Sequence, residues 1–143
     1  MRVAAKALIF NDQNQLLMLR YHKNHYNEHA RGKWDITGGK IKSDEKFADG
    51  LAREVFEETG LTELKIEAPV FVSEWWPMAR GGGIRIHIVA VFMICRTSGG
   101  EVKLNEEHDE FAWVTKDDIG KYDIMPEEVD AIEAAFKFVN QTR

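Results

Sequence analysis

The 143-residue chain has a single cysteine, no long hydrophobic run and no excess of positive charge. Cys95 alone cannot form an intramolecular disulfide, and its apolar surroundings indicate a small core side chain. The longest uninterrupted apolar run, residues 88–95, has eight residues, whereas a membrane-spanning helix needs about 20. The net charge of −5 argues against a general binder of nucleic acid or anionic membrane, which would carry a basic patch. We therefore expect one domain, residues 1–143, in a reducing cytoplasm.

One stretch, Gly39 to Leu61, predicts an amphipathic helix. Ser43 is placed to cap the free N–H groups of the first turn, with Asp44 and Glu45 at the positive end of the helix dipole. Gly60 can adopt the left-handed conformation that ends a helix. At roughly 100° per residue, the apolar residues share one arc that should face a core: Phe47, Ala48, Leu51, Ala52 and Val55.

A second arc of the same helix is acidic, because Glu54, Glu57 and Glu58 recur at i, i+3 and i+4. Each like-charged pair destabilises an isolated helix by about a few tenths of a kcal/mol. One interpretation is a solvated acidic face that Arg53 partly neutralises. The other is a site for a hard cation such as Mg²⁺, which prefers oxygen ligands. Gly50 lies on this arc, where the absence of a side chain leaves room for backbone or ligand.

The spacing of glycines and charges favours the cation site. The stretch reads G-x5-E-x7-R-E-U-x-E-E-x-G-U, where U is aliphatic, and every fixed position is filled. This pattern is the Nudix box, and the chain resembles the Nudix hydrolase family. The box covers 23 of the 143 residues, and the flanks match the family layout more loosely. The fixed positions are Gly39, Glu45, Arg53, Glu54, Val55, Glu57, Glu58, Gly60 and Leu61.

The resemblance implies the Nudix α/β/α sandwich, in which a mixed β-sheet lies between helices. It implies hydrolysis of the diphosphate linkage of a nucleoside diphosphate joined to a group X, with Mg²⁺ as cofactor and Mn²⁺ as an alternative. The implied metal ligands are Glu54, Glu57, Glu58 and the carbonyl of Gly38. The resemblance also implies that Arg53 orients one of these glutamates. It implies structural roles for Gly39, Glu45 and Gly60.

The sequence does not decide which glutamate is the general base. Glu107 lies six residues before Trp113 in an acidic loop and matches the family's distal glutamate, which completes the metal site or acts as base. A box glutamate is the alternative, and Glu106 and Glu110 compete for the distal position. The competing interpretation is that this acidic loop is exposed to solvent and has no role in the reaction.

Candidate substrate contacts lie outside the box, at Arg20, Arg31, Trp75, Trp76 and Arg85. The basic residues could meet phosphate, and one tryptophan could stack on a nucleobase. Solvated charges and packing beneath a loop are the competing interpretations. Pro77, 16 residues beyond Leu61, resembles a mark of the ADP-ribose-hydrolysing branch. Nucleoside triphosphates and ADP-ribose or nucleotide sugars therefore rank nearly level as substrates.

Hydrophobic alternation predicts strands over residues 3–10, 15–20, 69–74, 84–96, 101–104 and 111–114. Pro126 predicts the start of a last helix, with an apolar stripe at Val129, Ile132, Phe136 and Val139. Residues 21–33 form a polar loop whose three histidines are spaced too irregularly for a zinc site. We expect this loop to border the active site.

Two other function classes remain as alternatives. A Nudix-fold nucleotide-binding or regulatory module would lack catalysis and would not need the complete carboxylate set. An isoprenyl diphosphate isomerase on the same fold would depart from the box and use a cysteine in the cleft, whereas Cys95 lies in an apolar strand. Dimers are common in the family, so a homodimer stays open. We expect a small-molecule partner rather than nucleic acid or membrane.

Overall fold

The computed structural model describes residues 1–79 and 81–141. Its strands are β1 (Arg2–Phe10), β2 (Leu16–Tyr21), β3 (Trp34–Asp35), β4 (Thr37–Lys40), β5 (Lys65–Trp75), β6 (Ile88–Arg96) and β7 (His108–Val114). Its α-helices are α1 (Phe47–Thr59) and α2 (Val129–Gln141), and short 3₁₀ turns cover Ile119–Lys121 and Pro126–Glu128. None of the helices in the described ranges is long and apolar enough to cross a membrane.

The sheet is mixed and is organised around β1. This strand pairs in parallel with β6 over nine residues and antiparallel with β4, while β5 is antiparallel to β6. A second group, β3, β2 and β7, is antiparallel and joins β1 through the single pair Phe10 and Leu16. The two groups therefore meet at the end of β1, whereas β4 pairs with its first half and leads into the segment before α1.

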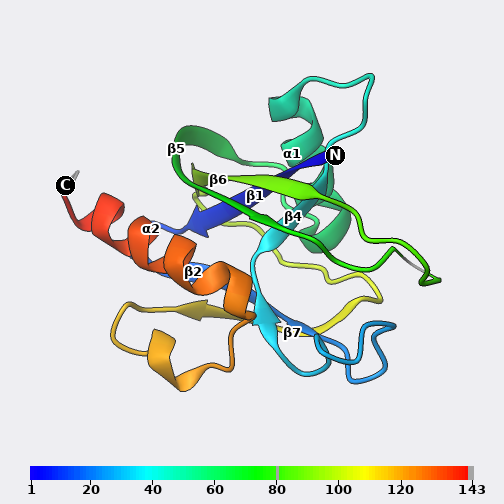
Figure 1. Cartoon of the computed structure of the whole chain (residues 1–143). Coiled ribbons are helices and arrows are strands. Elements are labelled where there is room, and N and C mark those ends of the chain that lie inside the picture. The colour runs from blue at the N-terminus through cyan, green and yellow to red at the C-terminus, as the bar shows by residue number, and fades with distance from the viewer. Residues whose placement is uncertain (80, 142–143) are drawn as a thin grey trace.

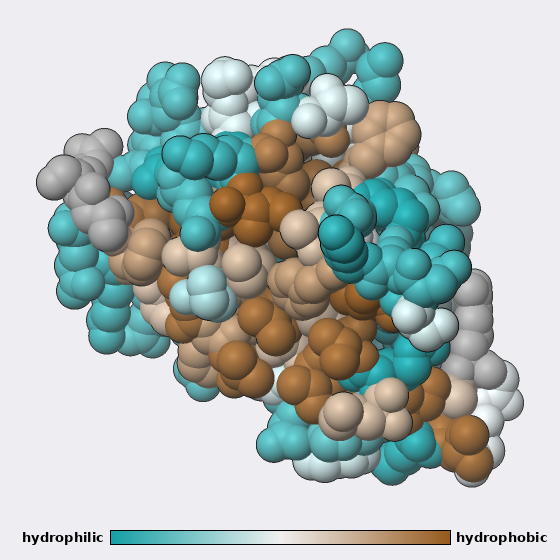
Figure 2. Space-filling view, turned by 90° about the horizontal axis from the view of Figure 1, so that it is seen from above, coloured by the Kyte–Doolittle hydropathy of each residue, from teal (hydrophilic) through white to brown (hydrophobic). Residues whose placement is uncertain are grey.

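Helices α1 and α2 lie on opposite sides of the sheet (Figure 1), and the alternation along β1 explains this placement. Ala5, Ala7 and Ile9 pack with the buried face of α1, whereas Ala4, Leu8 and Phe10 pack with α2. Successive side chains of a strand point to opposite faces, so one apolar strand supplies both cores. Seen from above, the surface shows apolar side chains across the centre and hydrophilic ones around them (Figure 2).

The predicted start of the first helix was wrong. The helix begins at Phe47, its N-cap is Lys46, and no side chain caps it. Glu45 instead accepts a 2.8 Å hydrogen bond from the Lys42 amide and binds Arg53. Leu51 and Val55 are buried as predicted, but Ala48 and Ala52 are exposed. The predicted end is confirmed, because Gly60 has φ = +74° and its amide bonds to the carbonyl of Phe56.

Two predicted strands also differ from the structure. The strand predicted over 84–96 begins only at Ile88, because Arg85 makes just an isolated bridge with Met78. Residues 101–104 are not a strand, and the Lys103 amide donates to the carbonyl of Thr59 at the end of α1. The strand predicted over 69–74 is longer, Lys65–Trp75. In the last helix Val129 is 47% exposed, while the other stripe residues are buried.

Candidate active site

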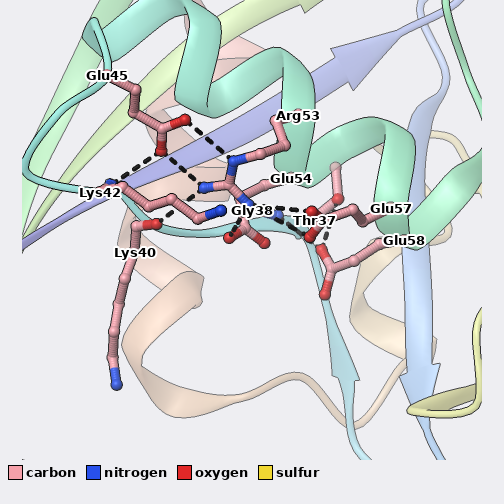
Figure 3. A network of polar contacts seen from close by, with 9 residues as sticks. All are labelled: Thr37, Gly38, Lys40, Lys42, Glu45, Arg53, Glu54, Glu57 and Glu58. Atoms are coloured by element: carbon pink, nitrogen blue, oxygen red, sulfur yellow. Dashed lines mark hydrogen bonds and ion pairs between the residues drawn. The ribbon is translucent and has the colours of Figure 1, made fainter.

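Arg53 forms hydrogen bonds with three carboxylates of the Nudix box (Figure 3). Its guanidinium binds both oxygens of Glu45, with Nη2 to Oε1 at 2.7 Å and Nε to Oε2 at 3.0 Å. Its Nη1 donates to Glu54 Oε1 at 3.0 Å and to Glu57 Oε1 at 3.2 Å. The hydrogen bonds from Arg53 lower the pKa of Glu45 to about 2. Glu45 thus anchors the arginine, which orients Glu54 and Glu57 by charge-assisted bonds.

Glu54 is partly buried. Burial raises its pKa, Arg53 opposes the rise, and the negative charges of Glu57 and Glu107 add to it. Gly39 lies directly against it, since a Cβ on Gly39 would stand 2.5 Å from Glu54 Oε2. The first glycine of the box is therefore needed so that the backbone of β4 can approach this carboxylate.

Glu58 points inward. It is 8% exposed, and its Oε1 accepts a 2.7 Å hydrogen bond from the Thr37 hydroxyl and a 2.9 Å bond from the Gly38 amide. Burial raises the pKa of Glu58 to about 7, although these hydrogen bonds and the charge of Lys6 act in the opposite direction. The Thr37 hydroxyl thus gives Glu58 a second donor beside the Gly38 amide.

Gly38 can occupy its place only as glycine. Its φ of +137° is disfavoured for other residues, and an added Cβ would lie 2.8 Å from the Cα of Lys6 in β1. Strand β4 therefore presses against β1, which brings Gly38 beside the end of α1. The position predicted to offer a carbonyl to a metal is thus held next to Glu58.

Glu107 lies in the turn before β7. Its carbonyl accepts a 2.9 Å bond from the His22 amide, its own amide donates to Asn105 Oδ1, and its carboxylate lies 3.9 Å from His25 Nε2. Its charge contributes to the raised pKa of Glu54. Glu110 is committed elsewhere, with Oε2 at 2.9 Å from Arg20 Nη1.

The carboxylates fit a hard cation by their chemistry. In the side-chain positions of the described residues, no three histidine, cysteine, aspartate or glutamate side chains stand close enough together to hold a metal ion. In Figure 3, Arg53 bonds both Glu54 and Glu57. The charges of Glu57 and Glu107 raise the pKa of Glu54, and a dication nevertheless suits such oxygen donors because it favours the charged form of a carboxylate. Glu54 and Glu57 could hold such an ion in competition with Arg53.

Two of the predicted substrate contacts lie near the histidine loop. Arg20 pairs with Asp109 at 2.9 Å and with Glu110 at 2.9 Å, and its guanidinium lies 5.9 Å from the ring centroid of Trp34. Arg31 is exposed and donates to the carbonyl of His25 at 2.7 Å. The charge of Arg20 is therefore balanced by two carboxylates of β7.

The other three predicted contacts lie at the β5–β6 hairpin. Trp75 packs against the α2-side core, whereas Trp76 is 50% exposed and stacks on His87 with ring centroids 4.6 Å apart. Arg85 Nη1 donates to the Trp76 carbonyl at 2.8 Å. Of the two tryptophans, only Trp76 has a ring exposed enough to meet a ligand.

A buried ionic cluster behind the site was missed in the sequence. Lys6 is 8% exposed, lies 3.5 Å from Asp35 and 3.8 Å from Glu128, and donates to a backbone carbonyl. The Tyr21 hydroxyl donates to Asp35 at 2.7 Å. The charge of Lys6 also opposes the rise in the pKa of Glu58. The available signal was a lysine inside an apolar strand, which requires a carboxylate partner.

A glycine-rich strand beside a helix of clustered carboxylates, set on a mixed sheet between two helices, defines a phosphoanhydride hydrolase of the Nudix type. The NUDIX domain family model matches residues 1–136. The chain belongs to the Nudix hydrolase family. Members of this family act on nucleoside diphosphate derivatives and generally use divalent metals.

Known proteins support this assignment. The nucleoside triphosphatase NudI of Escherichia fergusonii is 32% identical over 97 residues, which cover 65% of this chain and 69% of that protein. The MutT protein of Methanosarcina mazei matches with a TM-score of 0.74 and 29% identity over 98% of this chain and 95% of its own. The NUDIX domain of Shewanella oneidensis NrtR, solved with ADP ribose, shares the fold at a TM-score of 0.73 and 19% identity, with 96% and 87% of the two chains covered.

Proposed function

We propose that this protein is a Mg²⁺-dependent hydrolase of nucleoside triphosphates that releases the nucleoside monophosphate and pyrophosphate. The observation that carries the proposal is the arrangement of Glu54 and Glu57 on one guanidinium, beside the charge of Glu107. The similarity to a nucleoside triphosphatase supports the triphosphate over the other nucleoside diphosphate derivatives.

The proposed ligand set is Glu54, Glu57, Glu58 and the Gly38 carbonyl, with Glu107 as an outer member. A divalent ion held there, Mg²⁺ or Mn²⁺, would stabilise the negative charge that develops on the phosphoryl oxygens. Arg53 bonds Glu54 and Glu57, and an ion bound to these two glutamates would compete with those bonds. Glu57 and Glu107 are the two candidate general bases, because both are exposed carboxylates next to Glu54.

Charge complementarity supports the proposed phosphate contacts. An acidic protein with a net charge of −5 needs local cations as well as metal to bind a polyphosphate. Arg20 and Arg31 are candidates on the loop side, and Arg85 is the candidate on the hairpin side. The reducing cytoplasm remains the expected compartment.

ADP-ribose is the second candidate substrate, because of Pro77 and the exposed ring of Trp76 next to it. The isomerase alternative requires a reactive cysteine in the cleft. Cys95 is fully buried, and burial raises the pKa of its thiol to about 12, so no thiolate is available.

A turnover panel with chromatographic separation of products tests the proposal. It would contain ribo- and deoxyribonucleoside triphosphates, ADP-ribose, nucleotide sugars and dinucleoside polyphosphates, each with Mg²⁺, with Mn²⁺ and with chelator. Metal-dependent formation of monophosphate plus pyrophosphate is expected. AMP plus ribose phosphate from ADP-ribose, at a higher kcat/KM than any triphosphate, would replace the first substrate class by the second.

A further inference from the structure

Lys6 is a buried cation outside the proposed ligand set. Because successive side chains of a strand point to opposite faces, Lys6 lies on the α2 side of β1 with Ala4 and Leu8. We infer that Lys6 is a positioning residue of the reaction centre, because its ammonium group fixes the backbone of residues 35–36, which leads directly to Gly38. The inference rests on the proposed hydrolysis at the box glutamates.

Ile36 is the residue at which the chain changes its partner in the sheet. It follows β3, which pairs with β2, and it precedes β4, which pairs with β1. Ile36 belongs to neither strand and is 2% exposed, so its backbone groups need partners other than a strand ladder. Its amide donates to Asp35 Oδ1 at 2.7 Å, and its carbonyl accepts from Lys6 Nζ at 3.2 Å. Two side chains therefore satisfy the backbone at this point.

Asp35 depends on the same lysine. Its Oδ2 accepts a 2.7 Å hydrogen bond from the Tyr21 hydroxyl and lies 3.5 Å from Lys6 Nζ. Among the residues that the structure describes, Lys6 is the only cation within ion-pair distance of Asp35, and it also lies 3.8 Å from Glu128. Removal of the ammonium group would leave two buried carboxylates and the Ile36 carbonyl without their cation, which is costly in a protein interior.

The segment that Lys6 holds leads into the contacts of Glu58. The Thr37 hydroxyl and the Gly38 amide both donate to Glu58 Oε1 (Figure 3). Gly38 also stands opposite Lys6 in the pairing of β1 with β4, and a Cβ on Gly38 would lie 2.8 Å from the Lys6 Cα. Lys6 thus contacts residues 36–38 through both its backbone and its ammonium group. A shift of this segment would displace Gly38 relative to Glu58, and small misplacements at a reaction centre lower the rate.

Glu128 distinguishes positioning from a general contribution to stability. It pairs with Lys6 in the same buried cluster, but in the described part of the chain it bonds neither Ile36 nor a box glutamate. Glu128→Gln removes a charge from the cluster and leaves the Lys6–Ile36 bond in place. This variant is therefore the matched control for Lys6→Met, which removes the bond and keeps the length of the side chain.

Amide hydrogen exchange of the ¹⁵N-labelled full-length protein, in chelator, tests the positioning without turnover. In Lys6→Met the Ile36 and Gly38 amides should exchange about tenfold faster than in the wild type, relative to the amide of Ile94 in β6, because a buried carbonyl has lost its donor. Ile94 is fully buried and reports any general loss of stability. In Glu128→Gln the same ratio should stay within about threefold of the wild type.

The two variants should also differ in metal affinity and rate. Lys6→Met should weaken Mn²⁺ binding, measured by electron paramagnetic resonance, by about tenfold or more, the usual effect of losing a partner that orients metal ligands. Its kcat should fall by about tenfold or more, with KM changed by less than about threefold. Glu128→Gln should keep wild-type values. If Lys6→Met does not fold, Lys6→Met/Glu128→Gln, which removes one charge of each sign, is compared with Glu128→Gln.

Equal values for Lys6→Met and Glu128→Gln in exchange, Mn²⁺ affinity and kcat would overturn the inference, because the buried cluster would then contribute stability alone. Faster exchange at Ile94 to the same extent as at Gly38 would also overturn it. Mn²⁺ binding and hydrolysis by the wild-type protein are measured separately. If both are absent, the proposed function fails, whereas the exchange ratio still decides whether Lys6 holds residues 35–38.

Discussion

The hydroxyl of Thr37 donates a 2.7 Å hydrogen bond to Glu58 Oε1, and both groups are buried. The bond joins β4 to the last turn of α1, and the Gly38 amide reinforces it at 2.9 Å. A residue just outside the box therefore stabilises a box glutamate. This contact gives the first prediction.

Thr37→Val keeps the side-chain shape and removes the donor. A buried carboxylate that loses one hydrogen bond costs about 1–3 kcal/mol, so the free energy of unfolding should fall by that amount in urea denaturation. Thr62→Val, on the exposed segment after the helix, is the matched control. Equal stability of the two variants would show that the Thr37 hydroxyl does not hold Glu58.

Gly39→Ala should separate activity from stability. The added Cβ meets the carboxylate of Glu54 at 2.5 Å, and a flexible side chain can move away at little cost in stability. The displaced Glu54 would leave Arg53, and hydrolysis should fall by about tenfold or more, since small misplacements at a reaction centre have effects of this size. Gly120→Ala, where no atom lies within 4 Å of the new Cβ, should keep wild-type kcat/KM and melting temperature. Full activity of Gly39→Ala would refute the need for this close approach.

His108 should make stability depend on pH. Burial lowers the pKa of this histidine to about 4, against about 6.5 in an unfolded chain. The depressed pKa contributes stability that is complete above about pH 6.5 and is lost as pH falls towards 4, with a total of about 3 kcal/mol. Glu58 acts oppositely, because its raised pKa of about 7 gives stability that is lost as pH rises from about 4.5 through 7.

A substitution of His108 separates its effect on the pH dependence of stability from that of Glu58. Urea unfolding between pH 4.5 and 7.5, in chelator, should show that His108→Gln flattens the loss of stability on the acid side. His29→Gln, at an exposed loop position, should leave the wild-type profile intact. If His108→Gln and the wild type have parallel profiles, His108 is not the buried neutral group described here.

The box helix could be predicted from the sequence because its signals are local. Glycine at position 60 and the spacing of the glutamates fix the end of α1 and its acidic face. The start could not be predicted from local signals. Ser43, the predicted cap, lies before the helix, and Glu45, predicted in the first turn, binds Arg53 eight residues further on. Residues 101–104 have the alternation of a strand, but their backbone docks against the end of α1 at Thr59.

Part of the site could not be predicted because it depends on contacts between residues far apart in the sequence. Nothing in the neighbourhood of Lys6 shows that Asp35 and Glu128, 29 and 122 residues away, would meet it. The same holds for the bond from the His22 amide to the Glu107 carbonyl, which joins two loops that are far apart in the sequence. Sequence reasoning identified the carboxylates and the loops, and the fold alone brings them together.

The most direct test of the central claim is the turnover number of Glu57→Gln with the preferred triphosphate at saturating Mg²⁺. Glu57 is exposed and bonded to Arg53, so the neutral isostere should fold normally. We expect a loss of two or more orders of magnitude in kcat, the size of a general-base or metal-ligand effect. Glu63→Gln, an exposed glutamate beyond the box, should retain wild-type turnover. A kcat for Glu57→Gln within about threefold of the wild type would contradict the assignment of the box carboxylates as the reaction centre.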